Sequence, residues 1–166
     1  MFGNMLGSNI PASLFNFSKL QVIEFGRNQL SGVVPMELAK LTQLQHLYLH
    51  NNQLVSGSTT SLPILTALSN CSILQTIALR SNRLTGRLPF SAGHLSSKMD
   101  VIYLGDNELS GEIPPQIGNL TGLTLFDLES NFFTGAIPSS LNMLQKLERL
   151  YLGSNNLQEN IPMEIG

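Results

Sequence analysis

The sequence has 166 residues, of which 42% are hydrophobic and 12% are charged, and its formal net charge at pH 7 is -2. This composition is typical of one folded domain and excludes disordered and fibrous classes. The small negative charge gives no basic field for phosphate backbones, so it excludes nucleic acid as the expected partner. For the same reason, it does not support membrane-surface binding by this segment.

A single cysteine, Cys71, excludes an internal disulfide and a cysteine-based zinc cluster. No apolar run reaches about 18 residues, the length that a membrane-spanning helix requires. Residues 1–11 contain neither the basic region nor the continuous apolar region of a signal peptide. We therefore expect neither a signal peptide nor a transmembrane segment in this sequence.

A repeat of about 24 residues runs along the chain, and asparagines at intervals of 24 to 30 residues mark it. In chain order these asparagines are Asn4, Asn28, Asn52, Asn82, Asn107, Asn131 and Asn155. Leucine or phenylalanine follows each one by two positions, and apolar residues precede the last six by three, five and eight positions. The unit reads L-x-x-L-x-L-x-x-N-x-L, and such a period decides the fold assignment.

The L-x-L part of each unit predicts a short strand, around residues 23–25, 47–49, 77–79, 102–104, 126–128 and 150–152. Side chains alternate along a strand, so the leucines enter the core and the residues between them face solvent. One strand per turn forms a parallel stack in which each turn rests on its neighbours. Where the chain leaves the strand and bends, the asparagine amide can donate to and accept from backbone groups that lack a sheet partner.

Glycine and proline follow most of the asparagines, and they predict return segments that are short and irregular or helical. The turn over residues 53–81 is six residues longer, with Thr59 at the proline position. Within it we expect a short outer helix over residues 61–70, with Ser61 as N-cap and Pro63 in its first turn. We interpret this insertion as a surface bulge away from the binding site; the alternative is a loop insertion that touches the ligand.

These features predict one α/β solenoid over residues 1–166, with about six to seven repeats. We expect a right-handed superhelix with a parallel sheet on its concave face and short irregular or helical segments on its convex side. Because neither end has a capping unit, we expect a fragment of a longer protein.

The segment L-T-G-L-T-L-F-D-L-E-S-N-F-F-T-G-A-I-P-S-S-L-N-M-L, residues 120–144, resembles the plant-specific class of leucine-rich repeat, whose hallmark is L-x-G-x-I-P. The stretch that ends at Pro89, together with G-H-L-S-S-K-M-D-V-I-Y-L-G-D-N, is similar to receptor-like kinases that include plant immune receptors for flagellin and elongation-factor peptides. The resemblance implies an extracellular domain with cysteine-bearing caps, a secretory signal, one membrane span and a cytoplasmic serine/threonine kinase. It also implies a location at the extracellular face of the plasma membrane and a role in defence signalling.

Three N-x-S/T sequons begin at Asn16, Asn70 and Asn119, and each lies twelve residues before an asparagine of the repeat. The shared register is expected to place all three on the outer or lateral surface, opposite the strands. There a glycan could project without blocking a ligand. Polar residues in a recurrent turn would give the same triplets, but the common register favours a secreted glycoprotein.

All three tyrosines occupy one outward-facing strand position, four residues before an asparagine of the repeat. Tyrosine is enriched at interfaces, so we predict a ligand-binding face. Its candidate residues are Glu24, His46, Tyr48, His50, Arg80, Tyr103, Asp106, Asp127, Glu129, Arg149 and Tyr151. The acidic residues at 106, 127 and 129 would attract basic ligand side chains. The alternative is a solvated face that uses tyrosine for its β-propensity.

No catalytic residue, metal or cofactor is expected. His46 and His50 would lie about 13 Å apart along an extended chain, too far to share one ion. Cys71 occupies a position that is apolar in most other turns, and neither a phosphate-binding loop nor a kinase motif occurs.

Three hypotheses follow. The first is a segment of a receptor-kinase ectodomain that binds a peptide or protein ligand on the concave face, with a co-receptor as a further partner and a membrane-anchored parent protein. The second is a secreted, kinase-free repeat protein that inhibits cell-wall-degrading enzymes. The third is an intracellular scaffold.

Overall fold

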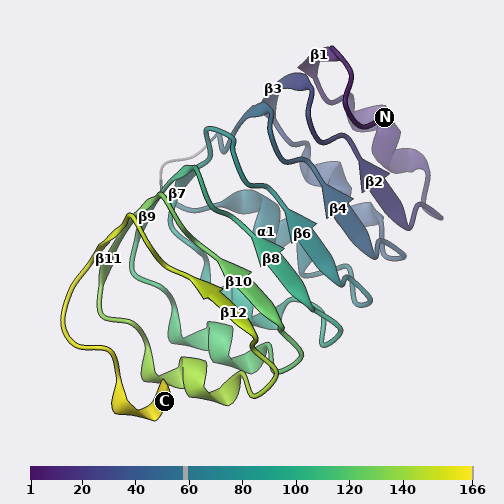
Figure 1. The fold of residues 1–166 in the computed structure, drawn as a ribbon. Helices are drawn as coiled ribbons and strands as arrows, with labels where there is room; N and C mark the ends of the chain where they lie inside the picture. The colour runs from purple at the N-terminus through teal and green to yellow at the C-terminus, as the bar shows by residue number, and fades with distance from the viewer. Residues whose placement is uncertain (58–59, 166) are drawn as a thin grey trace.

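The computed structural model describes residues 1–57 and 60–165, so Thr59 and Gly166 lie outside the described residues. Its turns stack side by side from the N-terminus to the C-terminus (Figure 1). One strand of each turn joins a parallel six-stranded sheet, in the order β12-β10-β8-β6-β4-β2. These strands are β2 (Val22–Glu24), β4 (His46–Tyr48), β6 (Thr76–Ala78), β8 (Val101–Tyr103), β10 (Leu125–Asp127) and β12 (Arg149–Tyr151). The predicted solenoid is confirmed, and each strand begins one residue earlier than expected.

The core lies directly beneath this sheet. In β4, Leu47 is 1% exposed, while His46 and Tyr48 on either side of it are only partly buried. In the central strands β6 and β10 the outward residues are buried as well. The inward residues of the stacked turns form one continuous hydrophobic cluster from Ile10 to Leu144. Cys71 belongs to this cluster as predicted, and burial raises the pKa of its thiol to about 11.

The repeated asparagines connect neighbouring turns as expected. The Asn52 side-chain oxygen accepts from the Leu30 backbone N–H at 3.0 Å, and its amide nitrogen donates to the carbonyls of Phe25 and Leu49, each at 3.0 Å. One acceptor and one donor group therefore join two turns. The same contacts recur at Asn28, Asn82, Asn107, Asn131 and Asn155. Asn4 donates only to carbonyls of its own turn.

The segment after each asparagine is more regular than the predicted irregular return, because it forms a second row of parallel strands. One sheet has the order β1-β3-β5 and the other β13-β11-β9-β7. The strands are β1 (Gly7–Asn9), β3 (Gln29–Val33), β5 (Gln53–Val55), β7 (Thr85–Gly86), β9 (Glu108–Gly111), β11 (Phe132–Gly135) and β13 (Asn156–Leu157). Each of these strands carries at most one inward-facing leucine or phenylalanine. The sequence therefore has no alternation of apolar and polar residues that would predict them. Hydrogen bonds to the neighbouring turns form these strands.

Short helices line the side opposite the six-stranded sheet (Figure 1). Six of them are 3-10 helices that begin directly after a proline; in the second of these, for example, the Leu38 N–H donates to the Pro35 carbonyl at 3.1 Å. The 3-10 helices are η1 (Ala12–Asn16), η2 (Met36–Lys40), η3 (Phe90–His94), η4 (Pro115–Asn119), η5 (Ser139–Met143) and η6 (Met163–Ile165). Each of the first five buries at least one apolar residue or glycine against the core.

The longer turn over residues 53–81 contains the predicted helix as α1 (Pro63–Leu68), which packs between η2 and η3. The predicted N-cap, Ser61, was wrong: Leu62 occupies that position and makes no side-chain cap hydrogen bond. Pro63 at the first helical position supplies the helical φ instead. The insertion lies on the side of the short helices, away from the strands of the main sheet, as interpreted, and it also extends the core, since Leu65 and Leu68 are at most 1% exposed.

The same insertion interrupts the second row of strands between β5 and β7. Buried Ser56 bridges the gap, since its hydroxyl donates to the Thr85 carbonyl at 2.7 Å and accepts from the Thr85 N–H at 2.9 Å. One side chain thus makes the donor and acceptor contacts that backbone groups make elsewhere in the row.

We predict that Asn107→Ala lowers the free energy of unfolding by about 2–4 kcal/mol, because it leaves the Leu84 N–H and the Leu79 carbonyl without their buried partner. Asn4→Ala is the matched control and should cost less than about 1 kcal/mol, since Asn4 is exposed. Urea unfolding followed by circular dichroism measures both. Equal losses in the two variants would contradict the connecting role of the asparagines.

Candidate ligand-binding face

The aligned register of the six-stranded sheet places the tyrosines in one outward-facing row. Tyr48 pairs with Ala78, Ala78 with Tyr103, Tyr103 with Asp127 and Asp127 with Tyr151. We call the outward side of this sheet, with the two residues that precede each repeated asparagine, the strand face. The structure brings the central candidate residues, from β4 to β10, together on this face.

Ala78 creates a hollow between two tyrosines. The cavity has a volume of about 250 Å³ and is lined by Tyr48, His50, Asn51, Ala78, Arg80 and Tyr103. Because alanine has the smallest side chain in this row, the space above β6 is open while tyrosines stand on the strands beside it. Ala78 was not among the predicted site residues. The sequence signal that could have identified it is a small residue between two tyrosines at the same repeat position.

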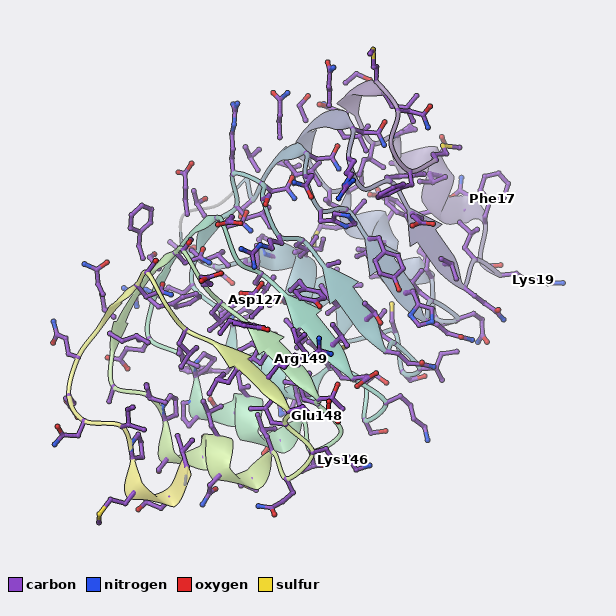
Figure 2. The ribbon with its side chains drawn as sticks, viewed as in Figure 1. Phe17, Lys19, Asp127, Lys146, Glu148 and Arg149 are labelled. Atoms are coloured by element: carbon purple, nitrogen blue, oxygen red, sulfur yellow. The ribbon has the colours of Figure 1, made fainter. Side chains whose placement is uncertain are left out.

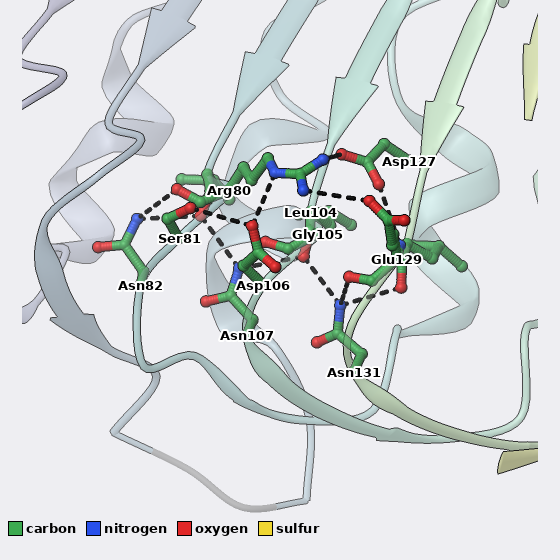
Figure 3. Close-up of polar contacts among 12 residues, drawn as sticks. Arg80, Ser81, Asn82, Leu104, Gly105, Asp106, Asn107, Asp127, Glu129 and Asn131 are labelled. Carbon is green, nitrogen blue, oxygen red and sulfur yellow. Dashed lines mark hydrogen bonds and ion pairs between the residues drawn. The ribbon is translucent and has the colours of Figure 1, made fainter. Parts of the chain in front are cut away.

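Arg80 is the centre of a charged cluster on the strand face (Figure 3). Its Nε lies 2.8 Å from Asp106 Oδ2, its Nη1 2.8 Å from Asp127 Oδ2 and its Nη2 3.1 Å from Glu129 Oε2. The guanidinium therefore connects the turn of β6 with the turns of β8 and β10. With one cation and three carboxylates, the cluster retains an excess of negative charge.

Asp127 differs from its predicted role as an open ligand contact. Its side chain is 0% exposed, covered by the ion pair with Arg80, and it also accepts the Glu129 N–H at 3.0 Å. Burial raises the pKa of this carboxyl, although the Glu129 N–H and the Arg80 charge oppose the shift. Asp127 therefore acts on the face by positioning Arg80. The partly exposed acids of the cluster are Asp106 and Glu129.

A glycine in the intervening turn leaves room for the Asp127 carboxylate that pairs with Arg80. Gly105 occupies the repeat position of Arg80 and Glu129, in the turn between theirs. A Cβ atom there would lie 2.8 Å from both carboxylate oxygens of Asp127. A methyl group at this position would push the Asp127 carboxylate away from its place in the ion pair with Arg80. Sequence analysis did not identify Gly105, since its role depends on a contact between two turns.

The two histidines take separate roles beside the hollow. The His46 ring stacks on Tyr48, with ring centroids 6.1 Å apart, and its Nδ1 lies 3.1 Å from the Thr76 hydroxyl. Burial and then the charge of Arg27 lower the pKa of His50, with Glu24 opposing. Within residues 1–57 and 60–165, no three His, Cys, Asp or Glu side chains are grouped to hold a metal ion.

The remaining candidate residues lie at the two ends of the sheet. Glu24 is exposed on β2, and Arg149 and Tyr151 are exposed on β12. Figure 2 shows Arg149 on the strand next to that of Asp127. These residues share the outward side but take no part in the cluster around Arg80.

The three sequon asparagines lie on the side of the short helices. Asn16 ends η1, Asn119 ends η4 and Asn70 follows α1 by two residues, and all three are exposed. Their positions leave the strand face clear, as the common register led us to expect.

We predict that Arg80→Met destabilises the fold at pH 7 by about 2 kcal/mol. This is less than the roughly 3–5 kcal/mol lost when a fully buried pair is broken, because the Arg80 side chain is 35% exposed. Loss of Arg80 would raise the pKa of the Asp127 carboxyl further. A raised pKa means that the folded protein holds this proton more tightly than the unfolded chain, so the penalty should shrink as the pH falls toward 4.

The measurement is urea unfolding of wild type and variant between pH 7 and pH 4. Exposed Arg83, in the same repeat, provides the control Arg83→Met, which should change stability by less than about 0.5 kcal/mol. A penalty for Arg80→Met that stays constant over this pH range would rule out an interaction with charged Asp127 as its source.

Comparison with known proteins identifies the repeat. Two family models, both described as leucine rich repeat, match the chain. The first matches residues 4–54. The second matches residues 43–71, 98–120 and 146–166. Together they cover most of the described turns.

Two relatives from Arabidopsis thaliana illustrate the similarity. LRR receptor-like serine/threonine-protein kinase EFR is 40% identical over 90 residues, which cover 54% of this chain and 9% of the relative. Receptor-like protein 39 is 32% identical over 145 residues, which cover 86% of this chain and 16% of the relative. The chain thus spans less than a fifth of either relative.

A solved structure shows the same fold over almost the whole chain. Plant peptide hormone receptor RGFR1, in complex with RGF2, superposes with a TM-score of 0.90 at 33% identity, covering 99% of this chain and 25% of that one. The repeat motif, the stacked turns and these matches show that the chain belongs to the leucine-rich-repeat family, in which its relatives are plant receptor kinases and receptor-like proteins.

Proposed function

We propose that this segment recognises a peptide or protein ligand on its strand face, as part of the extracellular domain of a plant receptor kinase with a role in defence signalling. The observation that carries this proposal is the aligned tyrosine row with a hollow at Ala78. Tyrosine contributes a large contact area and a hydroxyl at low entropic cost. The similarity to a receptor described as a complex with RGF2 supports a peptide ligand.

The strand face suits binding because it is held rigidly before any partner arrives. Hydrogen bonds within the sheet fix the backbone, stacking on His46 orients Tyr48, and three ion pairs hold Arg80. A preorganised surface avoids the entropic cost of ordering its side chains on association. We propose that the segment binds without catalysing a reaction. A co-receptor, if one joins, would contact surface that the ligand leaves free.

We further propose that this segment lies at the extracellular face of the plasma membrane. Three exposed sequons on the helix side support a secreted, glycosylated protein. Among the described residues, no helix has the length and apolarity to cross a membrane. Sequencing the flanking coding region for a membrane span and a kinase domain separates this proposal from a kinase-free secreted inhibitor.

To test the binding face, a displayed library of random twelve-residue peptides is selected on the 166-residue chain. We expect Tyr103→Ala combined with Tyr151→Ala to weaken the selected peptides at least about tenfold, since interface tyrosines each contribute about 1 kcal/mol or more. Phe17→Ala is the control, because Phe17 is 64% exposed beyond η1, far from β10 in Figure 2. Calorimetric titration measures affinity, and circular dichroism checks folding. Peptides that bind the double variant as tightly as wild type would exclude the strand face.

Glycosylation gives an independent test of the proposed location. Expressed with a secretory signal in plant cells, the chain should carry N-glycans at Asn16, Asn70 and Asn119, because all three are exposed. Each Asn→Gln variant should lose the mass of one glycan in mass spectrometry. Native protein from plant tissue with all three asparagines unmodified would instead support an intracellular scaffold.

A further inference from the structure

The hollow above Ala78 has the size of one side chain. Its volume of about 250 Å³ lies below the roughly 300–1,000 Å³ of pockets that enclose drug-sized ligands. Tyr48 and Tyr103 stand on the strands at either side, and Ala78, itself only 4% exposed, forms the floor. An extended partner that crosses the strands could therefore insert one residue here.

The spacing of the strands favours an aromatic residue in this position. Neighbouring strands lie about 4.8 Å apart, so the backbones of Tyr48 and Tyr103 are separated by about 10 Å. Side chains stand roughly perpendicular to a sheet. A ring inserted midway would lie about 5 Å from each tyrosine, within the roughly 4.5–7 Å that aromatic pairs prefer.

The charge next to the hollow favours a basic residue nearby. Asp106, Asp127 and Glu129 together exceed the single charge of Arg80, and the side chains of Asp106 and Glu129 are 41% and 38% exposed. An incoming carboxylate would add to this negative excess, although it could reach Arg80. An incoming ammonium or guanidinium group would reduce it.

We propose that the strand face takes an extended peptide segment whose aromatic side chain fills the hollow and whose lysine or arginine, about three residues away, lies against Asp106 and Glu129. The distance follows from two strand spacings of about 4.8 Å, between β6 and β10, and from about 3.3 Å per extended residue. This inference rests on the proposed function and specifies the chemistry of the ligand.

The same random dodecapeptide library provides the probe. Peptides selected on the wild-type chain should be enriched in Phe, Tyr or Trp, with Lys or Arg three positions away. Ala78→Leu, which fills the hollow, should weaken such peptides at least about tenfold. Ala12→Leu, the same enlargement at an exposed position of η1 on the side of the short helices, should change affinity less than about twofold. Tyr48→Ala removes one wall of the hollow and serves as a second variant if Ala78→Leu unfolds.

The charge requirement is tested separately. Glu129→Gln can keep the hydrogen bond from Arg80 but removes one negative charge. We expect it to weaken basic peptides several-fold and to reduce the salt dependence of their affinity. Exposed Glu108 provides the matched control Glu108→Gln, which should leave both quantities unchanged.

The outcomes separate this inference from the proposed function. Peptides that require Tyr103 and Tyr151 but tolerate both Ala78→Leu and Tyr48→Ala would overturn the proposal of an aromatic subsite. The proposal that the strand face binds the ligand would still hold. Selected peptides with aspartate or glutamate at the basic position would overturn the charge assignment alone. A selection that yields no peptide dependent on the strand face would overturn both proposals.

Discussion

The structure depends on pairing the backbone groups that are buried where each turn leaves the six-stranded sheet. At that bend a strand can no longer supply partners, and the asparagine amide pairs with an N–H and a carbonyl of the preceding turn. Because a buried backbone group without a partner costs about 1–3 kcal/mol, this side chain decides whether turns can stack. The leucines contribute the buried area, and the asparagines set how the turns meet.

The regular alignment of side chains on the strand face results from this stacking. Since every turn meets the next in the same register, residues from distant parts of the chain become direct neighbours. A small residue between larger ones then has a defined consequence. Ala78 opens space between two tyrosines, and Gly105 leaves room for the Asp127 carboxylate that pairs with Arg80. The cavity and the charge cluster thus both depend on a small residue at a repeat position where neighbouring turns carry a larger one.

The period of the sequence was sufficient to predict the main sheet, the asparagine contacts and the outward tyrosine row, because each follows from spacing within one repeat. It could not predict the second row of strands, whose pairing depends on neighbouring turns. Nor could it predict that Asp127 is buried, since the side chain that covers it comes from a residue 47 positions earlier. Repeat position fixes the direction in which a side chain points, and contacts between turns determine whether solvent reaches it.

The turn over residues 53–81 leaves the outward rows undisturbed. Its additional residues are taken up by α1 and the interrupted second row, so β4 and β6 pair like any other two strands. A partner that lies on the sheet therefore contacts evenly spaced strands, whatever the length of the chain that connects one strand to the next. Insertions behind the sheet can accumulate without changing the spacing of its strands. A new binding specificity can then arise by substitution of an outward residue on a single strand.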